Sequence, residues 1–86
     1  MKSIDELISK YIRGAECILK EIGEIPDDVH LNNEKAKTVF DWAKSYLEDA
    51  KYYLEKGKLD TSLTSVAYCE GLLDALRLLG AVEFSW

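Results

Sequence analysis

Hydrophobic residues return every three or four positions along three long segments of the chain, the spacing that places them on one face of an α-helix. The pattern predicts helices over residues 3–22, 33–56 and 60–79. The first break, residues 24–32, contains Pro26, and the second is a short turn around Gly57. Because so short a turn holds two helices side by side, the pattern predicts an all-α fold, a three-helix antiparallel bundle.

Polar residues at the segment ends support these boundaries. Ser3 and Glu6 have the spacing of a capping box, in which each side chain accepts a hydrogen bond from a backbone amide at the start of the helix. Asn32 or Asn33 is suited to cap the second helix, and Asp60 the third.

The second half of the third predicted helix is apolar over most of its circumference, because residues 68–79 leave only a narrow charged sector. A helix of this kind is expected at the centre of a fold, contacted on more than one side. Thr61, Ser62, Thr64 and Ser65 are expected either to face water or to let another helix approach closely. Gly71, in the middle, costs about 1 kcal/mol relative to Ala, so we expect a packing reason for it.

The tail that follows, AVEFSW, carries Val82, Phe84 and Trp86 at alternate positions. Apolar side chains of this size are not expected to stay in water. The tail therefore either folds back on the bundle or docks on another subunit, and in the second case dimerisation completes the bundle.

Composition narrows the classes of function. The 86 residues, 48% of them hydrophobic, suit one globular domain over residues 1–86, near the lower size limit for an adequate core. A net charge of -5 without a run of basic residues argues against nucleic-acid binding. No segment approaches 18 uncharged apolar residues, and acidic residues interrupt the first helix where a signal peptide would be apolar. We therefore expect a cytoplasmic protein without a membrane segment.

Residues that commonly carry catalysis or bind metals are sparse. Cys17 and Cys69 lack the spacing of a metal site or a disulfide framework, so we expect one exposed thiol and one small core residue. His30 lies in the acidic linker, where a solvated histidine is expected. Because no histidine is placed to activate a serine or threonine and no phosphate-binding loop is present, the sequence predicts no catalytic residue, no metal and no cofactor. Enzymatic activity is not favoured, but it is left open.

Glu70, Asp74 and Arg77 form the charged sector of the third helix, at positions i, i+4 and i+7. We call these three residues the charged seam. If the seam is exposed, the pair of Asp74 and Arg77 contributes only a few tenths of a kcal/mol. If it faces inward, its charges need partners, and they fix helix packing or bind a ligand such as an anion. The seam is the candidate ligand-binding site, with a structural ion pair as the alternative.

Aromatic residues widen the apolar stripe of the second helix. Trp42, Tyr46 and Tyr53 lie at helical spacing, which usually marks the edge of a core and, where exposed, an interface. With Phe84 and Trp86 of the tail they form the candidate interaction surface. The sequence leaves two hypotheses: a helical module that self-associates or binds another protein, which we prefer, and a small-molecule-binding protein or enzyme that uses the charged seam.

The segment WAKSYLEDAKYYLEKGKLDTSLTSVAYCEGLLDALRLLG, residues 42–80, resembles the small archaeal proteins grouped as domain of unknown function 357. The likeness lies in the order of an AKSYxEDAKYxLEKG segment, a hydroxyl-rich helix start, and a glycine followed by Asp74 and Arg77. It extends more weakly over the first helix. Members often have a histidine or another polar residue before the glycine and an aromatic residue after it, where this chain has Glu70 and Leu72. The resemblance implies a compact helical bundle and supplies no activity.

Overall fold

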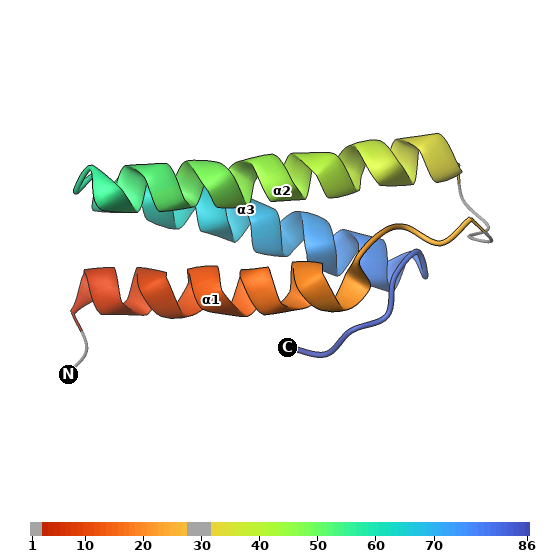
Figure 1. Ribbon diagram of the computed structural model, residues 1–86, viewed down its shortest axis with the longest axis horizontal. Helices are drawn as coiled ribbons and strands as arrows, with labels where there is room; N and C mark the ends of the chain where they lie inside the picture. Colours follow the sequence, from red (N-terminus) through yellow and green to blue (C-terminus); the bar gives the residue numbers. More distant parts are fainter. Residues whose placement is uncertain (1–2, 28–31) are drawn as a thin grey trace.

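The structure, a computed structural model, describes residues 3–27 and 32–86 and is a three-helix bundle (Figure 1). Its helices are α1 (Ile4–Ile22), α2 (Asn33–Glu55) and α3 (Leu59–Leu78). The predicted all-α bundle is confirmed, and every predicted helix boundary lies within one residue of the observed one. His30 falls outside the described residues.

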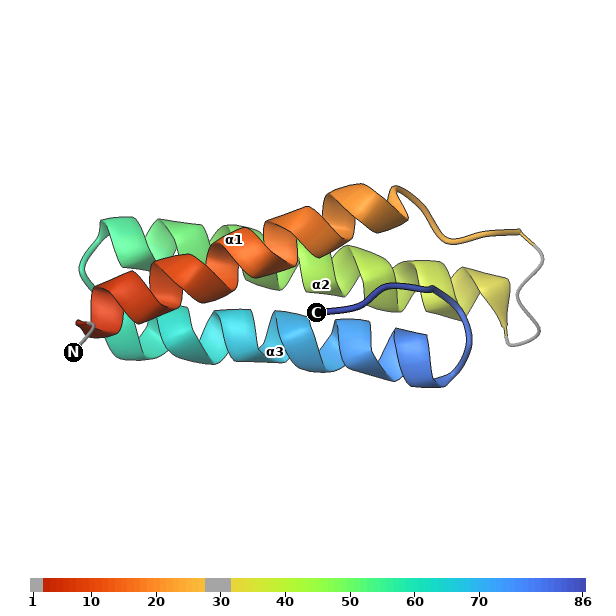
Figure 2. The same ribbon diagram turned by 90° about the horizontal axis from the view of Figure 1, so that it is seen from below.

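The turn around Gly57 joins α2 and α3 into an antiparallel hairpin, and α1 crosses this hairpin at an angle (Figure 2). Gly57 has a φ of 77°, the left-handed conformation that glycine adopts without strain. In this turn the Gly57 amide donates to the Leu54 carbonyl at 3.1 Å, and the Lys58 amide donates to the Tyr53 carbonyl at 2.9 Å. These bonds satisfy carbonyls at the end of α2, as expected for a glycine-terminated helix.

One of the predicted caps is present and two are not. The Asn32 carbonyl oxygen Oδ1 accepts from the Lys35 amide at 3.0 Å, which confirms the cap of α2. Ser3 precedes α1, but its side chain makes no capping hydrogen bond, and the nearby Ser3 hydroxyl lowers the pKa of the Asp5 carboxyl. Asp60 was also misplaced as a cap: α3 begins one residue earlier, and the Asp60 carboxylate accepts from the Thr61 amide at 2.9 Å.

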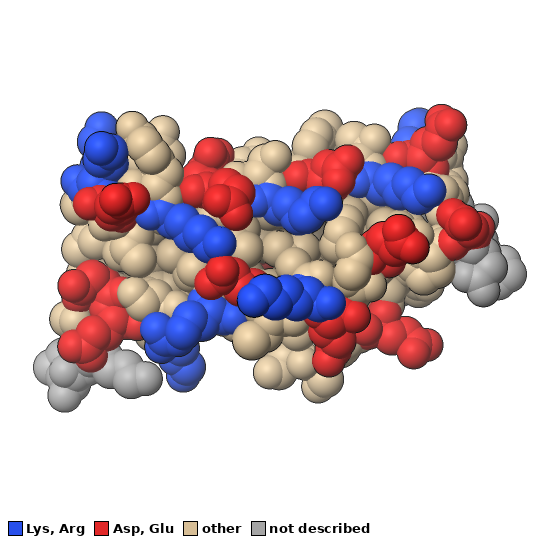
Figure 3. Space-filling view, in the orientation of Figure 1, with Lys and Arg blue, Asp and Glu red and all other residues tan. Residues whose placement is uncertain are grey.

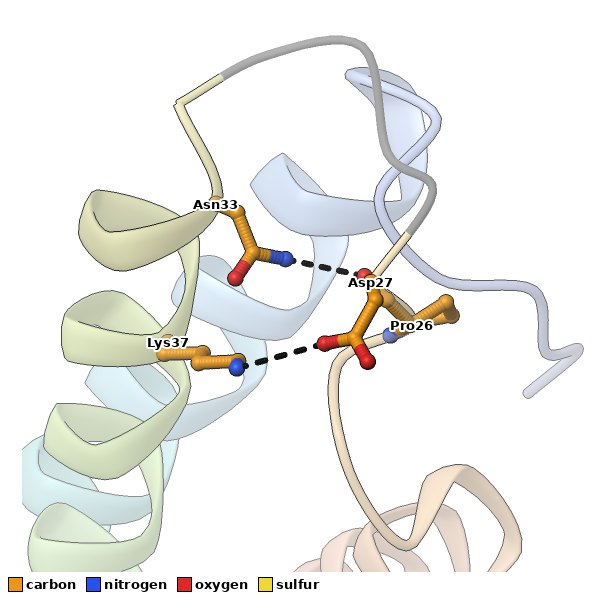
Figure 4. Close-up of polar contacts among 4 residues, drawn as sticks. All are labelled: Pro26, Asp27, Asn33 and Lys37. Carbon is orange, nitrogen blue, oxygen red and sulfur yellow. Dashed lines mark hydrogen bonds and ion pairs between the residues drawn. The ribbon is translucent and has the colours of Figure 1, made fainter.

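The linker between α1 and α2 is tied to the first turns of α2 (Figure 4). Asn33 Nδ2 donates to the Pro26 carbonyl at 2.9 Å, and Lys37 Nζ lies 3.5 Å from Asp27 Oδ1. Both contacts are exposed, so we expect them to position the linker and to add little to stability.

The core lies along the axis of the bundle. All three helices contribute to it, together with Ile25 of the linker and the first residues of the tail. Cys69 is fully buried and Cys17 is exposed, which confirms the expectation for both thiols. Ser62 and Ser65 are buried on α3, and the Ser62 hydroxyl donates to the Ala50 carbonyl of α2 at 2.6 Å. Short side chains here therefore allow α2 and α3 to approach closely.

The prediction that α3 is a central helix holds only in part. The helix packs against both α1 and α2, as expected, but its outward side is open, with Leu78 and Leu79 81% and 66% exposed. The reason is geometric, since each helix of a three-helix bundle contacts two others and keeps its third side open. A Cβ atom added to Gly71 would meet nothing within 4 Å, so the expected packing reason for this glycine is not found within the chain.

Candidate functional site

The C-terminal tail folds back on the bundle instead of extending from it. Gly80, with a φ of 79°, lets the chain reverse after α3, and the Ala81 amide donates to the Leu76 carbonyl at 2.9 Å. Ala81 and Val82 are then buried in the core. The rest of the tail runs back between α1 and α3 (Figure 2). The reversal places the tail aromatics beside the charged seam.

The seam and the tail form one cluster of contacts. Asp74 Oδ1 accepts from Arg77 Nη2 at 3.2 Å and from the indole nitrogen of Trp86 at 2.6 Å. The Arg77 guanidinium lies 5.4 Å from the centre of the Phe84 ring, which packs edge-to-face on Trp86 with ring centres 5.1 Å apart. We call this set the seam–tail cluster. Because the carboxylate and the guanidinium are both about 40% exposed, the ion pair alone contributes less than about 1 kcal/mol.

An open depression lies next to the seam–tail cluster, between α1, α3 and the tail. Its volume is about 420 Å³, and its lining includes Lys10 and Tyr11 of α1 together with Glu70, Asp74 and Trp86. Burial raises the pKa of Glu70, and the neighbouring Asp74 charge raises it further. Chemically, the depression offers two carboxylates, a lysine and two aromatic surfaces, a set suited to hydrogen bonding with a small polar ligand.

The raised pKa of Glu70 predicts how the stability of the Glu70→Gln variant compares with that of the unmodified protein at low and at neutral pH. Folded Glu70 binds its proton more tightly than the unfolded chain does, so ionisation of Glu70 lowers stability as pH rises from below the unfolded pKa. Glutamine has a similar shape and does not ionise. We expect Glu70→Gln to match the unmodified protein near pH 3 and to be the more stable of the two at pH 7, in urea unfolding followed by circular dichroism. Glu24→Gln, at an exposed linker position, is the control and should show no such trend.

The predicted interaction surface is divided in the structure. Tyr46 stacks on Tyr68 of α3, with ring centres 5.2 Å apart and planes 18° apart. Trp42, one turn earlier on α2, is 57% exposed on the same side. Tyr53 lies two turns beyond Tyr46 and packs edge-to-face on Tyr52. Phe84 and Trp86, in contrast, belong to the seam–tail cluster on the side of α3 that faces α1.

Sequence reasoning did not single out the outward side of α3, here called the α3 apolar face. This face includes the exposed ring of Tyr68, which is 58% accessible, and the side chains of Leu78 and Leu79. A shallow hollow of about 470 Å³ lies on it. The apolar and small residues on the face are Leu63, Thr64, Ala67, Tyr68, Gly71, Leu72, Ala75, Leu78 and Leu79. The signal in the sequence was the small residues Ala67, Gly71 and Ala75, four positions apart.

Charge is distributed unevenly around the bundle. The side formed by α1 and α2 carries interleaved basic and acidic side chains (Figure 3). Ion pairs there include Lys44 with Asp41 at 3.4 Å and Lys51 with Glu16 at 2.8 Å, and the bond to Glu16 raises the pKa of Lys51. Two charged residues lie on the side of α3 that carries the α3 apolar face, Asp60 at its N-terminal end and Asp74 near its margin. A surface of mixed charge thus lies on one side of this small protein and a mostly apolar surface on another.

Two further properties bear on function. Among residues 3–27 and 32–86, no group of three or more histidine, cysteine or carboxylate side chains gathers in a way that would hold a metal ion. None of the helices in this part of the chain combines the length and apolar character that crossing a membrane requires.

The fold and the two surfaces define a small three-helix bundle with a docked C-terminal tail and an open apolar helix face. Comparison with family models identifies it further: residues 10–82 match the family described as protein of unknown function (DUF357). The match covers most of the chain, so this protein belongs to domain of unknown function 357, as the resemblance indicated. No curated protein and no solved structure was found to match the chain.

Proposed function

We propose that this protein is a small helical interaction module that binds protein surfaces through the α3 apolar face. The observation that supports the proposal is the exposure of Tyr68, Leu78 and Leu79 along one side of a helix whose other face is in the core. Contiguous apolar patches on small proteins usually mark interaction sites. Trp42 and the stacked Tyr46 extend this face onto α2 and supply aromatic anchors of the kind that dominate binding energy.

The proposal places the module in the cytoplasm of an archaeal cell. The support for a cytoplasmic location is that Cys17 and Cys69 are both free thiols, as is usual in a reducing compartment. The archaeal source rests on the family resemblance alone.

A small-molecule-binding protein or enzyme that uses Glu70, Asp74 and Arg77 is the second candidate. The depression of about 420 Å³ beside Glu70 supports it. We rank it second because Asp74 already accepts hydrogen bonds from Arg77 and Trp86, and because Phe84 packs near Arg77. These contacts engage most of the seam within the chain itself.

Site-specific photo-crosslinking tests the interaction function. A photoreactive phenylalanine replaces Tyr68 on the α3 apolar face. As the control it replaces Tyr52, which is similarly exposed, at 54%, but lies on the side of α2 opposite the buried residues of that helix. On irradiation in cells of its own source, we expect protein adducts from position 68 and few from position 52. The proposal would be abandoned if position 68 gave no protein adduct, or if both positions gave the same adducts.

A further inference from the structure

The α3 apolar face is built symmetrically around Gly71. Ala67 and Ala75 lie four residues on either side of Gly71, and Thr64 and Leu78 lie seven residues on either side. All five positions project within a narrow sector on the outward side of the helix. When one such helix is turned end over end about Gly71, the same positions meet again in reverse order. A two-fold interface here therefore requires only that the residues meeting in reverse order complement one another in size.

We propose that the occupant of the α3 apolar face is a second copy of this chain, paired through antiparallel α3 helices about a two-fold axis at Gly71. This inference rests on the proposed function and names its partner. In the pair, Gly71 of one copy lies against Gly71 of the other, and Ala67 lies against Ala75. Leu78 of each copy lies against Thr64 of the other.

Shape supports this arrangement. Leu78 and Leu79 project from the C-terminal half of the face, and Leu78 is 81% exposed. The hollow of about 470 Å³ lies in the N-terminal half, lined by residues from Leu63 to Leu72. Leu78 and Thr64 are each roughly 10 Å along the axis from Gly71. The two-fold rotation thus carries each projecting leucine into the hollow of the other copy, so one patch supplies both the knob and the hole.

Gly71 itself supports a close helix approach. Glycine weakens a helix relative to alanine, and a Cβ at position 71 would meet nothing within 4 Å in the single chain. Its conformation is helical, so no turn requires it. A helix from a second copy crossing at this point explains the glycine, because the absence of side chains on both helices lets their axes come close together.

Area and charge are compatible with a dimer. A helix of 20 residues is roughly 30 Å long, and two adjacent helices span roughly 20 Å. The α3 face with its α2 flank therefore offers about 600 Å² per copy, or about 1,200 Å² for the pair, which is the lower end of the range for specific interfaces. At the margin, the Asp74 carboxylate is paired with Arg77 of its own chain at 3.2 Å, which offsets repulsion between copies.

Solution mass tests the pairing. By sedimentation equilibrium we expect twice the chain mass of 9.8 kDa for the unmodified protein at tens of micromolar. Leu78→Glu places two carboxylates in the apolar interface and should weaken the dimer by about a hundredfold or more. Because Leu78 is exposed in the single chain, this variant should retain its helical circular dichroism and melt cooperatively. Tyr52→Glu is the matched control, and it should remain dimeric.

Disulfide trapping tests the register. Cys17→Ser removes the exposed thiol and serves as the background. Ala67→Cys combined with Ala75→Cys should then form a covalent dimer on mild oxidation, because position 67 of each copy lies against position 75 of the other and Gly71 is left intact. Thr64→Cys should not, since its two copies lie roughly 20 Å apart, far beyond the reach of a disulfide.

A monomeric unmodified protein, a dimer that Leu78→Glu leaves intact, or trapping through position 64 as efficient as through positions 67 and 75 would each overturn the pairing. If the protein is monomeric and position 68 still crosslinks to another protein, the interaction function stands and the second copy is the wrong partner. If position 68 gives no protein adduct, both proposals fail together.

Discussion

Replacing Leu73 by alanine is expected to remove about 2–5 kcal/mol from the free energy of unfolding, because the deletion leaves a cavity that the core fills only partly. Leu73 is fully buried on the inward face of α3, in the cluster that joins all three helices. Small domains have only about 5–15 kcal/mol of stability in total. Urea unfolding followed by circular dichroism should therefore show a large fall in the denaturation midpoint.

Leu78→Ala is the matched control, since it makes the same deletion on the opposite face of the same helix. In dilute, monomeric protein it should change the free energy of unfolding by less than about 0.5 kcal/mol. At higher protein concentration the dimer stabilises the folded state of the unmodified protein by mass action. A difference in unfolding free energy between Leu78→Ala and the unmodified protein that grows with concentration would therefore report the pairing through α3. Equal losses for both variants at low concentration would mean that the faces of α3 have been assigned wrongly.

The contrast between these two leucines shows what the sequence of α3 did and did not contain. The spacing of its apolar residues predicted a helix and its ends, because periodicity and turn residues are local properties. It did not reveal which apolar side faces the core of the same chain. A helix surrounded by its own chain and a helix with one face left for a partner have the same apolar composition. Only the position of α1 and α2 separates the two cases.

The candidate site was predictable in part for a related reason. The alignment of Glu70, Asp74 and Arg77 follows from helical geometry alone. Their contacts with Phe84 and Trp86 do not, because these depend on the direction that the chain takes after Gly80. The sequence named both the seam and the tail, but it assigned them to different candidate surfaces. The structure joins them as the seam–tail cluster, and whether that cluster also binds a ligand stays a prediction.

Truncation after Ala81 is expected to lower the free energy of unfolding by about 2–4 kcal/mol. Val82 is 5% exposed, and full burial of a valine side chain contributes about 1.5–3 kcal/mol. Removing residues 82–86 also breaks the hydrogen bond from Trp86 to Asp74 and the contact between Phe84 and Arg77, which together add about 1 kcal/mol. Thermal melting by circular dichroism at one fixed protein concentration measures the loss.

Truncation after Phe84 is the control that separates core burial from the surface contacts. It removes Ser85 and Trp86, which are both exposed, and keeps Val82 in place. We expect it to lower stability by less than about 1 kcal/mol, since only the exposed indole contact is lost. Neither truncation touches the α3 apolar face, so any dimer should persist wherever the chain remains folded. Full stability after removal of residues 82–86, combined with loss of the dimer, would mean that the tail packs on a second subunit instead of on its own bundle.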